Sequence, residues 1–202
     1  MSQQEFYYTI EQASTAEFKD RGSRFLAFAY PLKDVASFKL ILQNLKKEHP
    51  KAAHHCFAYR IGLNNDNFRV SDDGEPSGTA GKPILNQIDS KELTNVAVIV
   101  VRYFGGTLLG VPGLINAYKS VTAMALQVVP IIQKPVTVSY RIHFDYTQMN
   151  EIMRWIKTFN LEILAQELQL FCSVDVSVPV KKTDEFKQML GDLRDVQVKQ
   201  MD

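Results

Sequence analysis

Two polar, glycine-rich stretches hold most of the residues in this sequence whose types could support chemistry. Residues 71–83 combine carboxylates, hydroxyls, glycines and a lysine, and residues 102–113 combine an arginine with closely spaced glycines. Shaped polar loops on a rigid scaffold are common places for binding and catalysis. We therefore expect both stretches to be surface loops that form one candidate site. The candidate ligand-binding residues are His54, Asp72, Asp73, Glu75, Ser77, Thr79, Lys82, Arg102, Gly105, Gly106, Gly110 and Asn116.

The second stretch has an order of elements that can bind an anion. A strand that ends near Arg102, the Gly105-Gly106 pair and a helix that begins near Pro112 would direct free N–H groups and a helix dipole toward a phosphate. Lys82 could add positive charge. The alternative is that the glycines only provide the backbone conformations of a tight turn. The stretch has neither the Gly-Lys-Ser/Thr ending of a P-loop nor a complete G-x-G-x-x-G pattern.

Metal binding is not expected, although histidines and carboxylates occur near each other in the sequence. His54 and His55 are adjacent on an expected strand, so their side chains should point to opposite faces. The carboxylates have structural alternatives, in which Asp72 or Asp73 caps a turn and Glu75 pairs with a nearby lysine or arginine. We expect no metal and no cofactor.

Covalent catalysis has little support in the sequence. Ser77 and Thr79 have no activating base close to them along the chain. Cys56 lies between apolar strand neighbours and is interpreted as a core thiol. Tyr103 and Phe104 could stack on bases, but aromatic residues at the end of a buried strand are usually packing residues.

The composition is that of an ordinary folded protein without a strong charge preference. The chain has 202 residues, 46% of them hydrophobic, and a net charge of +1. This near-neutral charge does not by itself favour nucleic acid or an anionic membrane. Two cysteines in separate strand patterns, no visible signal peptide and no apolar run long enough to span a bilayer predict a cytoplasmic protein.

Hydrophobic periodicity predicts alternating strands and helices in the first part of the chain. The run at 96–103 is almost continuously apolar, which is typical of a central strand covered on both faces. Asp34 is placed to cap a helix. The expected strands cover residues 23–30, 54–61, 68–70 and 96–103, the expected helices cover residues 34–49, 84–88 and 112–129, and a hairpin turn is expected at 62–66.

The last part of the chain has a clearer pattern. The order strand, helix, strand, strand, helix, strand predicts a ferredoxin-like βαββαβ domain, and Pro130 and Pro135 bracket the expected boundary. We therefore predict an α+β protein with two domains, residues 1–133 and 134–202. The expected strands are 136–144, 161–170, 171–180 and 196–201, and the expected helices are 147–159 and 183–193.

The polar stretches and their neighbours resemble the IMPACT/YigZ family. The similar blocks occur in the family's order and are KDRGSRF at 19–25, HHCFAYRIG at 54–62, SDDGEPSGTAGKP at 71–83 and VVRYFGG at 100–106. This chain departs from the family pattern at Pro112, which removes an N–H from the loop, and at Asn116, which replaces an arginine. A further departure is the sequence Ala-His-His at 53–55, where the family often has Thr-His-Asn.

The resemblance implies both a fold and a broad function. It implies a first domain, an α/β sandwich, similar to the second domain of a small-subunit ribosomal protein and to domain IV of elongation factor G. It also implies a ferredoxin-like second domain. Eukaryotic relatives resemble translational regulators.

From these features we predict a non-enzymatic binding protein that contacts RNA, the ribosome or a translation-related partner through the two loops. The alternative hypothesis is an enzyme or sensor for a phosphorylated or acidic small metabolite, acting through the same loops.

Overall fold

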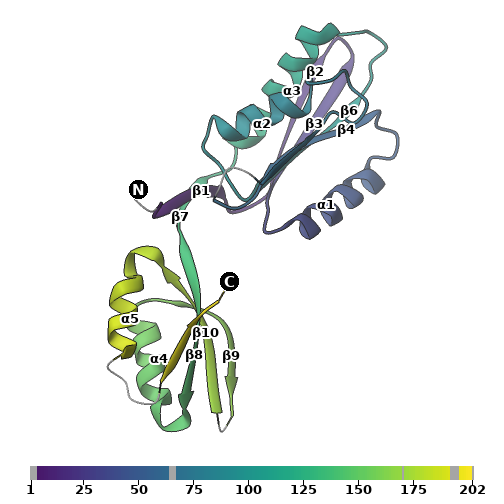
Figure 1. Ribbon diagram of the computed structural model, residues 1–202. Coiled ribbons are helices and arrows are strands. Elements are labelled where there is room, and N and C mark those ends of the chain that lie inside the picture. The colour runs from purple at the N-terminus through teal and green to yellow at the C-terminus, as the bar shows by residue number, and fades with distance from the viewer. Residues whose placement is uncertain (1–3, 64–66, 170, 192–195, 202) are drawn as a thin grey trace. The chain divides into compact units, whose positions relative to one another are not determined.

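The computed structural model describes residues 4–63, 67–169, 171–191 and 196–201 (Figure 1). The chain forms two compact units. One unit is Tyr7–Lys134, and the other combines residues 4–6 with residues 135–201. No helix among these residues is both long and apolar enough to cross a bilayer.

A five-stranded antiparallel sheet forms the centre of the unit Tyr7–Lys134. Its strands, in spatial order, are β2 (Ser14–Asp20), β3 (Ser23–Pro31), β6 (Val96–Tyr103), β4 (His54–Arg60) and β5 (Phe68–Ser71). All residues from Val96 to Arg102 in the middle strand are buried. The prediction of a central strand covered on both faces is therefore confirmed.

Helices cover both faces of this sheet (Figure 1). On one face lies α1 (Val35–Glu48), and on the other lie α2 (Gly81–Asp89) and α3 (Gly110–Gln127). Asp34 caps α1 as predicted, because its side chain accepts the backbone N–H of Ser37 at 2.7 Å.

Three strands of this unit were not predicted. They are β1 (Phe6–Ile10), β2 and β7 (Ile131–Pro135), and β1 pairs with β7 in a separate two-stranded sheet. Most residues of β7 are exposed, so it lacks the alternation of apolar and polar residues that identifies a half-buried strand. The segment between Pro130 and Pro135 is thus a strand instead of an irregular connection.

The C-terminal unit contains a four-stranded antiparallel sheet with two helices packed on it. The strand order is β11 (Gln197–Gln200), β8 (Thr137–Asp145), β10 (Phe171–Pro179) and β9 (Glu162–Leu168). The helices are α4 (Met149–Thr158) and α5 (Thr183–Gly191), each preceded by a 3-10 turn, η1 (Tyr146–Gln148) or η2 (Val180–Lys182). The predicted succession of strands and helices is confirmed, and the apolar faces of both helices contribute to one core.

Three predicted features fall partly outside the described residues. They are the hairpin turn at 62–66, of which 64–66 lie outside, the strand end at residue 170 and the helix end at residues 192–193.

Candidate functional site

A buried ion pair joins the two predicted loops. Arg102 Nη1 lies 2.6 Å from Glu75 Oε1, and the two residues are only 4% and 8% exposed. The hydroxyl of Tyr118 donates to the same carboxylate oxygen at 2.8 Å, and Arg102 Nη2 donates to the hydroxyl of Ser23 at 3.4 Å. Buried charges are stable only when they are paired and hydrogen-bonded, and this carboxylate has both kinds of partner. Glu75 therefore pairs with Arg102, one of the two alternatives expected from the sequence.

Below the ion pair, Tyr118 and Cys56 extend the hydrogen-bonded network. The Cys56 thiol donates to the carbonyl oxygen of Asp72 at 2.9 Å and lies 3.3 Å from the Tyr118 hydroxyl. Burial raises the pKa of the Cys56 thiol and that of the Tyr118 hydroxyl well above their ordinary values. Both groups therefore stay protonated, and the thiol is a core group, as predicted, instead of a reactive nucleophile.

Asp72 holds the polar loop against the start of α2. Its two carboxylate oxygens accept the N–H groups of Gly78 at 2.8 Å, Ala80 at 3.0 Å and Gly81 at 2.8 Å. Burial acts to raise the pKa of Asp72, but these three donors outweigh it and hold the pKa below its usual value. Asp72 therefore caps the turn, which is the structural role expected from the sequence for either Asp72 or Asp73.

Asp73 faces residues near α1. Its backbone has a positive φ of 41°, and its side chain accepts the N–H of His55 at 2.7 Å. Lys46 Nζ lies 3.8 Å from the other carboxylate oxygen. The ring of His55 is buried beside the same carboxylate, and burial lowers the pKa of that ring.

His54 points toward the ion pair. Its Nε2 lies 3.9 Å from Glu75 Oε1, and its Nδ1 is 2.8 Å from the carbonyl oxygen of Asp73. The adjacent His55 faces the α1 side, so the two rings point to opposite faces of the sheet, as predicted.

The expectation that residues 71–83 form a surface loop was wrong for part of the stretch. Glu75, Thr79 and Ala80 are buried, and residues 81–83 belong to α2. These residues can be buried although the stretch is polar, because hydrogen bonds within the protein satisfy their polar groups. The Thr79 hydroxyl, for example, donates to the carbonyl oxygen of Pro76 at 2.7 Å.

Three predicted residues lie apart from this network. Ser77, Lys82 and Asn116 are exposed, and their side chains make no hydrogen bond or ion pair with another described residue. Lys82 lies in the first turn of α2 and Asn116 lies on α3.

The glycines of the second loop have conformational roles. A Cβ at Gly105 would lie 1.9 Å from the carbonyl carbon of Gly22, and the Gly105 N–H donates to the hydroxyl of Ser23 at 3.2 Å. Gly106 and Gly110 adopt φ values of +84° and +70°. The close approach and the positive φ angles agree with the turn-forming alternative that the sequence left open.

A pocket of about 330 Å³ opens above the ion pair. His54, Glu75 and Arg102 line it together with apolar residues from the second loop and the start of α3. Phe104, Leu108 and Val111 line the same pocket and are 50%, 80% and 51% exposed, and we call these three residues the apolar rim.

The apolar rim was not predicted. Phe104 was interpreted as a packing residue, but half of it is exposed, and its ring lies 5.6 Å from the Arg102 guanidinium carbon. The available signal was the pair Leu108-Leu109 within a glycine-rich turn, where polar residues are the norm.

The described residues around the ion pair contain no candidate metal site. Within residues 4–63, 67–169, 171–191 and 196–201, no group of three or more His, Cys, Asp or Glu residues could hold a metal ion. Arg102 Nε is buried without a hydrogen-bond partner in the same ranges. His54, Glu75 and Arg102 thus form a polar floor of the pocket, and the apolar rim presents apolar surface to solvent.

Comparison with known proteins identifies the family. The profile of the Impact N-terminal domain matches residues 21–126, which include both loops. The IMPACT family member YigZ of Escherichia coli (strain K12) is 34% identical over 172 residues, 84% of this chain and 84% of YigZ. The chain belongs to the IMPACT family.

Solved structures add two further similarities to this IMPACT family protein. A crystal structure described as that of a hypothetical protein has a TM-score of 0.77 and 30% identity, and covers 99% of each chain. The two-domain translational regulator Yih1 is 30% identical, with a TM-score of 0.34, and the match covers 59% of this chain and 45% of Yih1.

Proposed function

We propose that this IMPACT family protein is a cytoplasmic, non-enzymatic binding protein that contacts a protein component of the translation apparatus through the apolar rim. The observation that carries the proposal is the exposure of Phe104, Leu108 and Val111 around one pocket. Exposed apolar patches rimmed by polar residues mark interaction surfaces in soluble proteins. Aromatic and aliphatic anchors that enter pockets contribute most of the affinity in such interfaces.

The charges of the site favour a protein partner over a phosphate backbone. Arg102 would be the natural phosphate ligand in the pocket, but Glu75 already neutralises it at 2.6 Å. Strong phosphate binding requires several uncompensated lysines or arginines. Direct RNA contact through this pocket is therefore the less favoured form of the proposal.

The translational part of the proposal is supported by family membership and by the description of the similar chain Yih1 as a translational regulator. We also propose that the two compact units are two domains, the second of which is ferredoxin-like. Its strand order β11-β8-β10-β9 and its βαββαβ succession support this assignment. The likeness of the first domain to ribosomal-protein and elongation-factor modules is proposed from the family resemblance alone.

The test is a binding measurement with purified ribosomes, ribosomal RNA and individual translation factors over a range of salt concentrations. We expect Leu108→Asp to weaken binding at least about tenfold, since a charge would replace an apolar side chain that the partner would cover. The matched control is Leu40→Asp, because Leu40 lies on α1 and is 63% exposed.

Two results would argue against the proposal. Equal effects of the two aspartate variants would mean that the rim is not the interface. Binding that depends steeply on salt and is reproduced by RNA alone would assign the contact to phosphates instead of a protein.

A further inference from the structure

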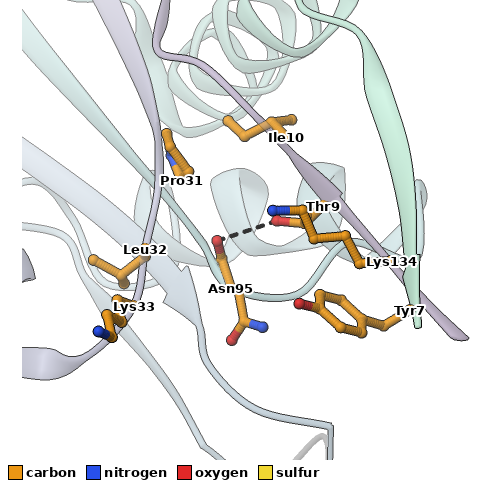
Figure 2. A pocket seen from close by; sticks show the side chains of 8 residues that line it. All are labelled: Tyr7, Thr9, Ile10, Pro31, Leu32, Lys33, Asn95 and Lys134. Carbon is orange, nitrogen blue, oxygen red and sulfur yellow. Dashed lines mark hydrogen bonds between the residues drawn. The ribbon is translucent and has the colours of Figure 1, made fainter. Parts of the chain in front are cut away.

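A second pocket, of about 320 Å³, lies within the unit Tyr7–Lys134 and shares no residue with the apolar rim or the ion pair (Figure 2). Its polar groups come from four places in the chain. Strand β1 contributes Tyr7 and Thr9, Lys33 follows β3, Asn95 precedes β6, and Lys134 lies in β7.

The residues that line this pocket include two lysines, Lys33 and Lys134, and no carboxylate. Lys134 forms no ion pair with any residue in the described ranges. Lys33 is next to Asp34, whose carboxylate accepts the N–H of Ser37 at the start of α1. The pocket therefore has a positive potential, and concave surfaces concentrate such potentials.

Asn95 is held so that one polar group remains to bind a ligand. Its backbone carbonyl accepts the Leu32 N–H at 2.7 Å and the Thr9 hydroxyl at 3.3 Å, and its side-chain Oδ1 accepts the Gly62 N–H at 2.8 Å. Because both oxygens are engaged, the side-chain NH₂ group is a fixed hydrogen-bond donor. Figure 2 shows the side chains of Tyr7, Asn95 and Lys134 around the pocket, and the hydrogen bond from the Thr9 hydroxyl to the backbone oxygen of Asn95.

We infer that this pocket binds a small organic anion, either a carboxylate or a phosphate. The anionic group would accept hydrogen bonds from Lys134, the Asn95 amide and the Tyr7 hydroxyl, and hydrogen bonds of this kind to a charged group are strong. The apolar part of the ligand would lie against Ile10 and Leu32. The volume is at the lower end of the roughly 300–1,000 Å³ typical of ligand sites, which suits a small molecule. This inference is independent of the proposed function, because the two sites share no residue.

The experiment is a titration of the full chain, labelled with nitrogen-15, with inorganic phosphate, phenyl phosphate and benzoate, followed by NMR. We expect the side-chain amide signals of Asn95 to shift when at least one organic probe is added at concentrations up to about 10 mM. That range is high enough to detect a dissociation constant of about 1 mM. Phenyl phosphate and benzoate distinguish the two anionic groups. Inorganic phosphate alone should bind more weakly than phenyl phosphate, because it lacks the apolar part.

Three variants complete the experiment. Lys134→Gln should weaken binding about tenfold, because it removes a charge-assisted hydrogen bond while keeping a side chain of similar length. Lys33→Gln should have a smaller effect, because Asp34 already offsets part of its charge. Lys119→Gln is the matched control, since Lys119 is an exposed lysine of α3 that lines neither pocket.

The inference is overturned if no probe shifts the Asn95 signals. It is equally overturned if the shifts occur but Lys134→Gln and Lys119→Gln change the affinity to the same extent, since the probes would then bind general positive surface.

Discussion

Replacing Arg102 by methionine would test whether the buried ion pair between Arg102 and Glu75 stabilises the fold. Arg102→Met keeps an apolar stem but leaves the Glu75 carboxylate with the Tyr118 hydroxyl at 2.8 Å and the His54 ring at 3.9 Å. Breaking a buried ion pair by removing one partner costs about 3–5 kcal/mol. Because Tyr118 still donates to the carboxylate, we expect a loss of stability at the lower end of this range, about 3 kcal/mol. Such a loss raises the population of the opened unit Tyr7–Lys134 about 100-fold.

The assay is native-state hydrogen exchange of the backbone amides of β6. The only tryptophan, Trp155, lies in α4 of the other unit, so its fluorescence would not report on this ion pair. Arg24→Met is the matched control, because Arg24 makes an exposed ion pair with Glu17. Exposed ion pairs contribute little to stability, so we expect this variant to exchange almost as the unaltered protein does.

A second comparison separates the loss of attraction from the cost of an unpaired buried charge. The double variant Glu75→Leu/Arg102→Met should be more stable than Arg102→Met alone, because no buried charge is left without a partner. The reasoning is refuted if Arg102→Met exchanges no faster than Arg24→Met, or if the double variant is no more stable than the single one.

Three further predictions follow from the same structure. Asp72→Ala should destabilise the unit Tyr7–Lys134 by about 2 kcal/mol, because three backbone N–H groups lose their acceptor. Asp34→Ala should cost less, since its carboxylate accepts one backbone N–H, that of Ser37. Hydrogen exchange of the β6 amides measures both effects, and equal effects of the two variants would contradict the prediction. Gly105→Ala should be more destabilising than Gly106→Ala in thermal unfolding, because its Cβ would meet backbone at 1.9 Å, whereas the second change adds only backbone strain of about 1 kcal/mol. Arg141 donates hydrogen bonds to the Asp175 carboxylate and holds the pKa of that carboxyl below its usual value. The stability that ionised Asp175 contributes is therefore present at neutral pH and is lost as the pH falls below about 4. Urea unfolding followed by tryptophan fluorescence should show a smaller loss of stability in acid for Asp175→Asn, and an identical loss in both proteins would contradict the assignment.

Elements with local signals could be predicted from the sequence. The cap at Asp34 depends on Ser37, three residues away, and the continuous apolar run of β6 indicates a strand buried on both faces wherever its neighbours lie. The paired strands β1 and β7 could not be predicted in the same way. Their partners are more than a hundred residues apart, and the exposed residues of β7 give no periodic pattern.

In the candidate site, too, features with a local signal could be predicted and features that depend on distant residues could not. The glycine positions and the alternative pairing of Glu75 were available from the residue types alone. The burial of Glu75 was not, because it depends on Arg102 and Tyr118, which lie 27 and 43 residues further along the chain. The exposure of Phe104, Leu108 and Val111 around one pocket was likewise not predictable, because it depends on how the second loop and the start of α3 pack in the folded unit.

The most direct test of the central claim is site-specific photo-crosslinking to purified translation components. A photo-reactive amino acid would replace Leu108 in the apolar rim in one protein and Leu40 on α1 in another, since both positions are exposed. We predict a discrete adduct with a protein of the translation apparatus from position 108 only, and excess unlabelled protein should suppress it. The same adducts from both positions, or adducts with RNA alone, would contradict it.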